Sequence, residues 1–112
     1  MITFLKAEEQ HQHSNGGGWV ANTAVVAASA YIGPNALVYG DARVYDDARV
    51  YGDALVFGNA RVFGNARVCG NAQVCDDALV SGNARVYGDA LVSGDARVSG
   101  NAILVTSKGE RQ

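Results

Sequence analysis

A six-residue unit recurs through most of the chain and restricts the folds open to it. From Val38 to Ile103 the sequence reads VYGDAR, VYDDAR, VYGDAL and eight further units of the same form, without insertion. Val20, Val26 and Ile32 extend the pattern backward, so fifteen units share one register up to Leu104. A fixed short period is the signature of a stacked repeat, in which each unit buries its apolar residues against its neighbours.

Each unit combines a very short strand with a bend. The Val and the Ala two residues before it alternate with a single residue that is Arg or Leu in most units, which is the period of a half-buried strand. Gly-Asp, Gly-Asn or Asp-Asp follows, and these residues tolerate the positive φ of tight turns. The residue between Ala and Val, and the residue after Val, are therefore expected to point outward.

Two competing folds fit the repeat less well. A six-residue period drifts off any helical face, and a Gly in nearly every unit disfavours a helix. A stack of hairpins remains an alternative, with two-residue turns and strands of about four residues. A coil that keeps turning the same way stacks the units in parallel and buries Val on Val, so a parallel β-solenoid is predicted.

The units also resemble a known family. The spacing of an aliphatic and a small residue, as in Val44 and Ala48 or Val62 and Ala66, resembles the hexapeptide repeat of left-handed parallel β-helices. This resemblance implies an all-β, left-handed parallel β-helix of about five triangular coils of 18 residues. The YGDARV-type units after the GGWV segment are more closely similar to small hexapeptide-repeat proteins of bacteriophages and bacteria.

The chain divides into three parts under this interpretation. Residues 1–18 are an N-terminal cap or arm, residues 19–105 the β-helix, and residues 106–112 a C-terminal tail. Phe4 and Leu5 are expected to cover the open first coil, because solenoid ends need capping. The far end has little to cap it, so end-to-end stacking is a further expectation.

With 18 residues per coil, one of the three sides lacks charge and is apolar. An apolar patch on a folded protein usually marks an interface. This side is predicted to be buried in a homo-oligomer, and the family resemblance favours a trimer; the alternatives are a dimer or a monomer with a somewhat apolar surface. The candidate interface residues are Trp19, Leu37, Tyr39, Leu55, Phe57 and Leu91.

The other two sides carry stacked arginines. Like charges at this spacing repel unless something negative lies between them. The corner residues Asp47, Asp53 and Asp89 could balance them, or a small anionic ligand such as a nucleotide could bind, because Arg and aromatic faces suit phosphates and bases. The candidate ligand-binding residues are Arg49, Arg67 and Arg85 with Tyr51 and Tyr87 beside them on the third side, and Arg43 and Arg61 on the second.

Charge and hydropathy narrow the partners and the location. The net charge of −2 argues against binding to DNA or RNA duplexes and to anionic membranes. No apolar run reaches membrane-spanning length, so no membrane partner is expected. Cys69 and Cys75 lie on different sides, which disfavours a disulfide, and free thiols fit a cytoplasmic protein. For a phage-encoded chain this would be the host cytoplasm.

An enzyme is not expected. The acyltransferases and carbonic anhydrases that share this fold use His as general base or zinc ligand, whereas here His11 and His13 both precede the solenoid. No cofactor, metal or catalytic residue is predicted. The sequence favours a non-catalytic oligomeric binding protein that sequesters a small anionic ligand in inter-subunit grooves. A structural assembly scaffold and an acyltransferase-like enzyme remain the alternatives.

Overall fold

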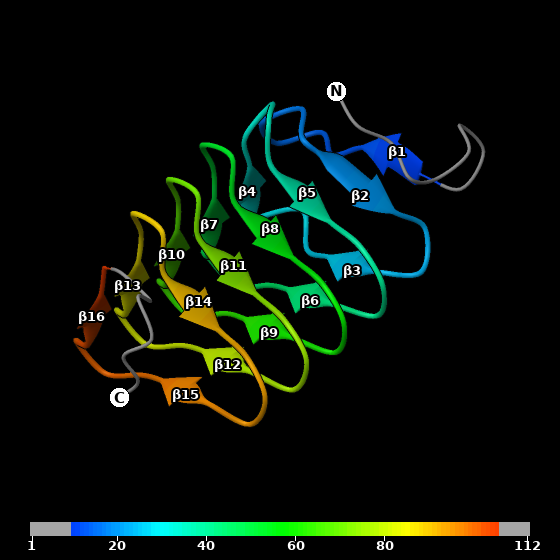
Figure 1. The fold of residues 1–112 in the computed structure, drawn as a ribbon. Helices are drawn as coiled ribbons and strands as arrows, with labels where there is room; N and C mark the ends of the chain where they lie inside the picture. Colours follow the sequence, from blue (N-terminus) through cyan, green and yellow to red (C-terminus); the bar gives the residue numbers. More distant parts are fainter. Residues whose placement is uncertain (1–9, 106–112) are drawn as a thin grey trace.

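The computed structural model describes residues 10–105, which form sixteen strands of two or three residues and no helix. Fifteen of the strands wind into a parallel β-solenoid of five coils with a triangular cross-section (Figure 1). Strands 18 residues apart pair in parallel, as Arg67 does with Arg49 and Arg85. The predicted all-β solenoid with 18-residue coils is confirmed, and its left-handed path stays a prediction of the resemblance.

Each side of the prism is one sheet, with a strand from every coil. The first side contains β2 (Trp19–Ala21), β5 (Leu37–Val38), β8 (Leu55–Val56), β11 (Gln73–Val74) and β14 (Leu91–Val92). The second side contains β3 (Val25–Val26), β6 (Arg43–Val44), β9 (Arg61–Val62), β12 (Leu79–Val80) and β15 (Arg97–Val98). The third side contains β4 (Tyr31–Ile32), β7 (Arg49–Val50), β10 (Arg67–Val68), β13 (Arg85–Val86) and β16 (Ile103–Leu104).

The core is a column of Val and Ala that runs the length of the solenoid. Val68 lies in register between Val50 and Val86, and all three are fully buried. Small and β-branched side chains suit this narrow interior, because they fill it with few lost rotamers. Backbone N–H groups on either side of each buried Val donate to the next coil. Among them, Arg67 N–H donates to Ala84 O at 3.0 Å.

Glycines with positive φ form most of the corners. At two corners Asp replaces Gly, and Asp46 and Asp76 take the same backbone conformation with φ of 61° and 59°. Their carboxylates accept hydrogen bonds from the next coil, at 3.2 Å from Gly64 N and 3.0 Å from Gly94 N. A short acidic side chain therefore occupies a left-handed corner by bonding to the coil beyond it.

Side chains outside the core also stack from coil to coil. The Tyr39 and Phe57 rings lie parallel with centroids 4.9 Å apart, and Tyr45 and Phe63 stack in the same way at 4.8 Å. These separations match the spacing of paired strands. The ladders cover much of the surface of the residues after Val, so most of these residues are half-buried although they point outward.

The segment before the first coil contacts two of its sides. β1 (Gln10–Gln12) pairs antiparallel with β2 and extends the first side. Farther along, Gly18 N–H donates to Ile32 O and Ile32 N–H donates to Asn15 O. The edge of the third side thus pairs with residues 15–18. The capping role predicted for Phe4 and Leu5 falls outside the described residues, as does the predicted tail at 106–112.

Candidate functional site

A polar groove of about 870 Å³ runs along the third side. The outward residues of β4, β7, β10 and β13 form its floor, because parallel pairing places them one above another. Residues from the neighbouring corner form one wall. The lining residues are Asn15, Ser29, Tyr31, Asp47, Arg49, Tyr51, Asn65, Arg67, Asn83 and Arg85.

The three arginines predicted for this side form an unbroken column in the groove. Arg67 pairs in register with Arg49 before it and Arg85 after it, and all three are exposed. Neighbouring Cα atoms in such a ladder lie about 4.8 Å apart. Within residues 10–105, no carboxylate forms an ion pair with any of the three guanidinium groups.

The corner carboxylates thus do not balance the arginines by direct pairing. Asp47 lines the groove, whereas Asp53 and Asp89 lie outside its lining. Three cationic groups against one carboxylate leave the groove positive in a protein whose net charge is −2. The column is therefore a local concentration of positive charge.

The N-terminal end of the groove is aromatic. The Tyr31 and Tyr51 rings meet edge to face with centroids 6.5 Å apart. Two glycines hold the backbone close to these rings: a Cβ on Gly16 would lie 3.0 Å from the Tyr31 ring, and one on Gly33 would lie 2.9 Å from Tyr51 Cβ. Tyr31 is half-buried, so its ring is packed yet open to the groove.

Tyr51 also contacts the residue below it in its column. A hydrogen bond with the Cys69 thiol, together with burial, raises the pKa of Tyr51, while the charges of Arg67 and Arg49 lower it. The net direction is upward, so the phenol stays neutral at physiological pH and keeps its proton for hydrogen bonding. The electrostatic influence of both arginines shows that the phenol and the guanidinium groups share one environment.

Carboxamides line the groove beside the arginines. Asn65 Nδ2 donates to Asn83 Oδ1 at 3.3 Å, and Asn83 continues the ladder to Asn101 at the same distance. The amide groups are thereby oriented along the arginine column. Asn15 reaches the other end of the groove and donates to the carbonyl oxygens of Ala30 and Ser29.

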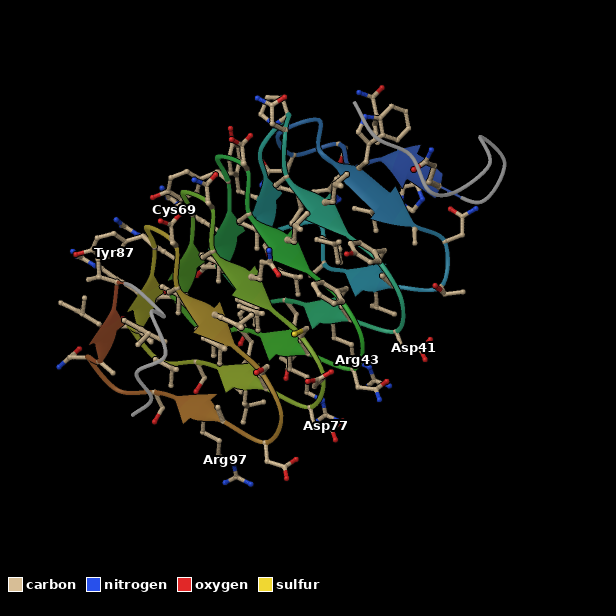
Figure 2. All side chains as sticks on the ribbon, in the orientation of Figure 1. Asp41, Arg43, Cys69, Asp77, Tyr87 and Arg97 are labelled. Atoms are coloured by element: carbon tan, nitrogen blue, oxygen red, sulfur yellow. The ribbon has the colours of Figure 1, made fainter. Side chains whose placement is uncertain are left out.

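The remaining predicted ligand-binding residues lie elsewhere. Arg43 and Arg61 line a separate groove of about 520 Å³ on the second side, with Arg97. Asp41 and Asp77 line it too, so three arginines face two carboxylates; Figure 2 shows four of these side chains along one edge of the prism. Tyr87 belongs to neither groove. It is exposed at the corner after β13, in the same column as Cys69 (Figure 2).

Sequence reasoning did not include Tyr31, Asn65, Asn83, Asn15 or Ser29 in the site. The register supplies the missing signal for Tyr31, which pairs with Arg49 at the head of the arginine column. The Asn residues share a spacing of 18 with Asp47 and were visible in the same way. Asn15 and Ser29 could not be placed, because Asn15 precedes the repeat and its path is set by the backbone bonds of residues 15–18.

The residues predicted to form an oligomer interface do share the first side. Leu37 pairs with Trp19 and Leu55, and no Arg, Lys, Asp or Glu occupies an outward strand position there. Leu91 is 47% exposed, whereas the ring stack half-covers Tyr39 and Phe57. Cys75 follows Phe57 in this column and is buried. The side is thus a continuous, uncharged strip.

The histidines and cysteines make structural contacts. His13 is buried and its Nε2 bonds to Ala30 O at 2.8 Å, while His11 Nδ1 bonds to Asn22 Oδ1 at 2.6 Å. Cys69 and Cys75 are free thiols. Among residues 10–105, no three metal-binding side chains gather in one place. Nor does this part of the chain contain a long apolar helix of the kind that crosses membranes.

The five-coil prism and its arginine groove define a parallel β-solenoid repeat protein. The YdcK β-solenoid repeat family matches the sequence in eight overlapping segments. The chain belongs to this family, since the matches together span more than half of it. No curated protein and no solved structure gave a significant match. The matched segments are residues 42–58, 48–62, 54–70, 60–76, 72–88, 80–94, 84–100 and 90–105.

Proposed function

We propose that this protein is a non-catalytic binding protein that holds a small anionic ligand in the groove of the third side. One observation carries the proposal: Arg49, Arg67 and Arg85 stack in register and form no ion pair within the described residues. Stacked like charges repel one another, by about 1 kcal/mol per pair at this spacing in water. An anion bridging the column would turn that repulsion into attraction, and Arg is well suited to phosphate or carboxylate oxygens.

The apolar first side supports a homo-oligomer, for which we propose a parallel trimer. The first and third sides meet at the corner that carries Tyr51 and Cys69. A partner packed on the first side would therefore stand beside the ligand groove and could deepen it. The same strip also supports the second candidate function, a scaffold that assembles through its solenoid sides without any ligand.

The setting of this function rests on the resemblance alone. Similarity to phage hexapeptide-repeat proteins suits a cytoplasmic protein that sequesters a nucleotide signal of the host. Acyl transfer is less well supported, because the described histidines, His11 and His13, bond to Asn22 and Ala30 outside the groove. A fold shared with enzymes does not establish an activity.

Binding of inorganic triphosphate by calorimetry tests the ligand proposal. Arg67→Ala should weaken binding at least 10-fold, because it removes the centre of the column. Arg61→Ala is the matched control, since Arg61 has the same charge and strand position but lines the second groove. Equal losses for the two variants would mean that net charge alone attracts the anion. Absence of any binding by the unmodified protein would also refute the proposal.

Sedimentation of a second pair of variants tests the oligomer. Leu55→Asp places a charge at the centre of the first side and should dissociate the assembly. Leu79→Asp is matched in strand position but lies on the second side, so it should leave the assembly intact. A sedimentation coefficient of Leu55→Asp equal to that of the unmodified protein would show that the first side is not the interface.

A further inference from the structure

The groove of the third side changes character along its length. Its central column runs Tyr31, Arg49, Arg67, Arg85, with Ile103 next in the same sheet beyond the lining. Aromatic surface therefore lies at one end and positive charge at the other. From this order we infer that the groove binds a nucleoside polyphosphate lengthwise, with its base at the tyrosine end and its phosphates along the arginines. The inference rests on the proposed anion-binding function and adds the class and orientation of the ligand.

The tyrosine end is built to receive a flat ring. Tyr31 is held by its edge contact with Tyr51 and by the close backbone of Gly16, so little ring motion would be lost on binding. Stacking of a base on an aromatic side chain contributes about 1–3 kcal/mol. Asn15 and Ser29 add polar groups at this end, which suit the hydrogen-bonding edge of a base.

Charge fixes the direction in which the ligand lies. Asp47, the carboxylate among the lining residues, sits in the coil of Arg49 and beside the tyrosines. Its negative charge disfavours phosphate at that end. The corresponding corner residues in the next two coils are Asn65 and Asn83, whose neutral amides stand beside Arg67 and Arg85. Phosphates are thus favoured at the far end, where two arginines act without an opposing carboxylate in the lining.

The length of the column selects for several phosphates. Three coil steps separate Tyr31 from Arg85, which at the strand spacing is about 14 Å. A nucleoside monophosphate bound at the tyrosines would reach Arg49 and leave Arg85 unused. A single-stranded nucleic acid fits less well, because the aromatic residues that line the groove occur at one end and offer no repeated stacking platform.

Calorimetry with adenosine triphosphate, adenosine monophosphate and inorganic triphosphate tests the inference. The unmodified protein should bind adenosine triphosphate at least 10-fold more tightly than either of the other two. Arg85→Ala should weaken binding of the triphosphates and leave the monophosphate unchanged. Tyr31→Leu should weaken both nucleotides and leave inorganic triphosphate unchanged. Tyr87→Leu, a tyrosine outside the groove, should change none of the three.

The outcomes separate this inference from the proposal beneath it. If inorganic triphosphate binds as tightly as adenosine triphosphate, the base contributes nothing; the inference then fails while the anion site stands. If Arg85→Ala weakens the monophosphate as strongly as the triphosphate, the orientation is wrong. Tighter binding of oligoadenylate than of adenosine triphosphate would favour a nucleic-acid strand instead. If none of the phosphates binds, both proposals fall. Equal far-ultraviolet circular dichroism of all variants would show that each one folds.

Discussion

The corner glycines make the stability of the solenoid sensitive to a single methyl group. Gly64 has φ of +71°, and a Cβ built on it would lie 3.0 Å from Gly82 N and 3.2 Å from Gly82 O in the next coil. Gly64→Ala must therefore strain its own backbone and push the neighbouring coil away. Gly94 has φ of +61° and would place its Cβ within 4 Å of no described atom, so Gly94→Ala isolates the backbone strain.

The two variants differ by the cost of the crowded coil. A left-handed Ala costs roughly 1–2 kcal/mol, and the stiffer unfolded chain returns about 0.4–1 kcal/mol. Gly94→Ala should thus lose about 1 kcal/mol of unfolding free energy. Overpacking adds roughly 1–3 kcal/mol, which brings Gly64→Ala to about 2–4 kcal/mol. The structure itself offers a partial remedy, since Asp46 and Asp76 occupy equivalent corners and bond to the next coil.

Urea unfolding monitored by circular dichroism measures all three variants. Gly64→Asp should be more stable than Gly64→Ala, because its carboxylate can accept a hydrogen bond from Gly82 N, worth roughly 1 kcal/mol. Equal stability of Gly64→Ala and Gly94→Ala would refute the crowding argument. Gly64→Asp less stable than Gly64→Ala would refute the role given to the corner carboxylates.

Three further predictions concern the core, the thiol and the ring ladder. Val68→Ala in the middle coil should lose about 2 kcal/mol or more of unfolding free energy in urea, whereas Val98→Ala in the last coil, where the side chain is only partly buried, should lose less. Burial, together with the charge of Asp76, raises the pKa of Cys75, so the folded state favours the protonated thiol; stability should be full below about pH 8.5 and fall above it, and less steeply in Cys75→Ala. Phe57→Ala should lose at least 1 kcal/mol in the same unfolding assay, since it removes the partner stacked on Tyr39; a change below about 0.3 kcal/mol would show that the ladder is incidental.

The register of the solenoid could be predicted from sequence because an 18-residue coil leaves no freedom in it. Once Val50, Val68 and Val86 stack, Arg49, Arg67 and Arg85 must stack as well. β1 could not be predicted in this way. Its sequence, Gln-His-Gln, has no apolar alternation, and its position depends on pairing with β2 rather than on its own residues.

The site was predicted less completely than the fold. The arginine column follows from register, but its lack of ion pairs depends on side-chain positions that no spacing reveals. Tyr87 shares the spacing of Tyr51 yet lies outside the groove, because the aromatic contact with Tyr31 exists at the first end alone. Chemical type and spacing placed the residues on one side, and the packing of their neighbours decided which of them line the groove.

The pairing of every strand with the one 18 residues away also limits how such a gene can change in length. Losing or gaining a single hexapeptide would keep Val on Val, yet it would move every later residue to the adjoining side and cut the arginine column in two. Losing or gaining three hexapeptides at once would preserve all three sides and shorten or lengthen the groove by one arginine, about 4.8 Å. Whole-coil duplication is therefore a route by which descendants of this chain could be matched to ligands of different length, with no new residue type required.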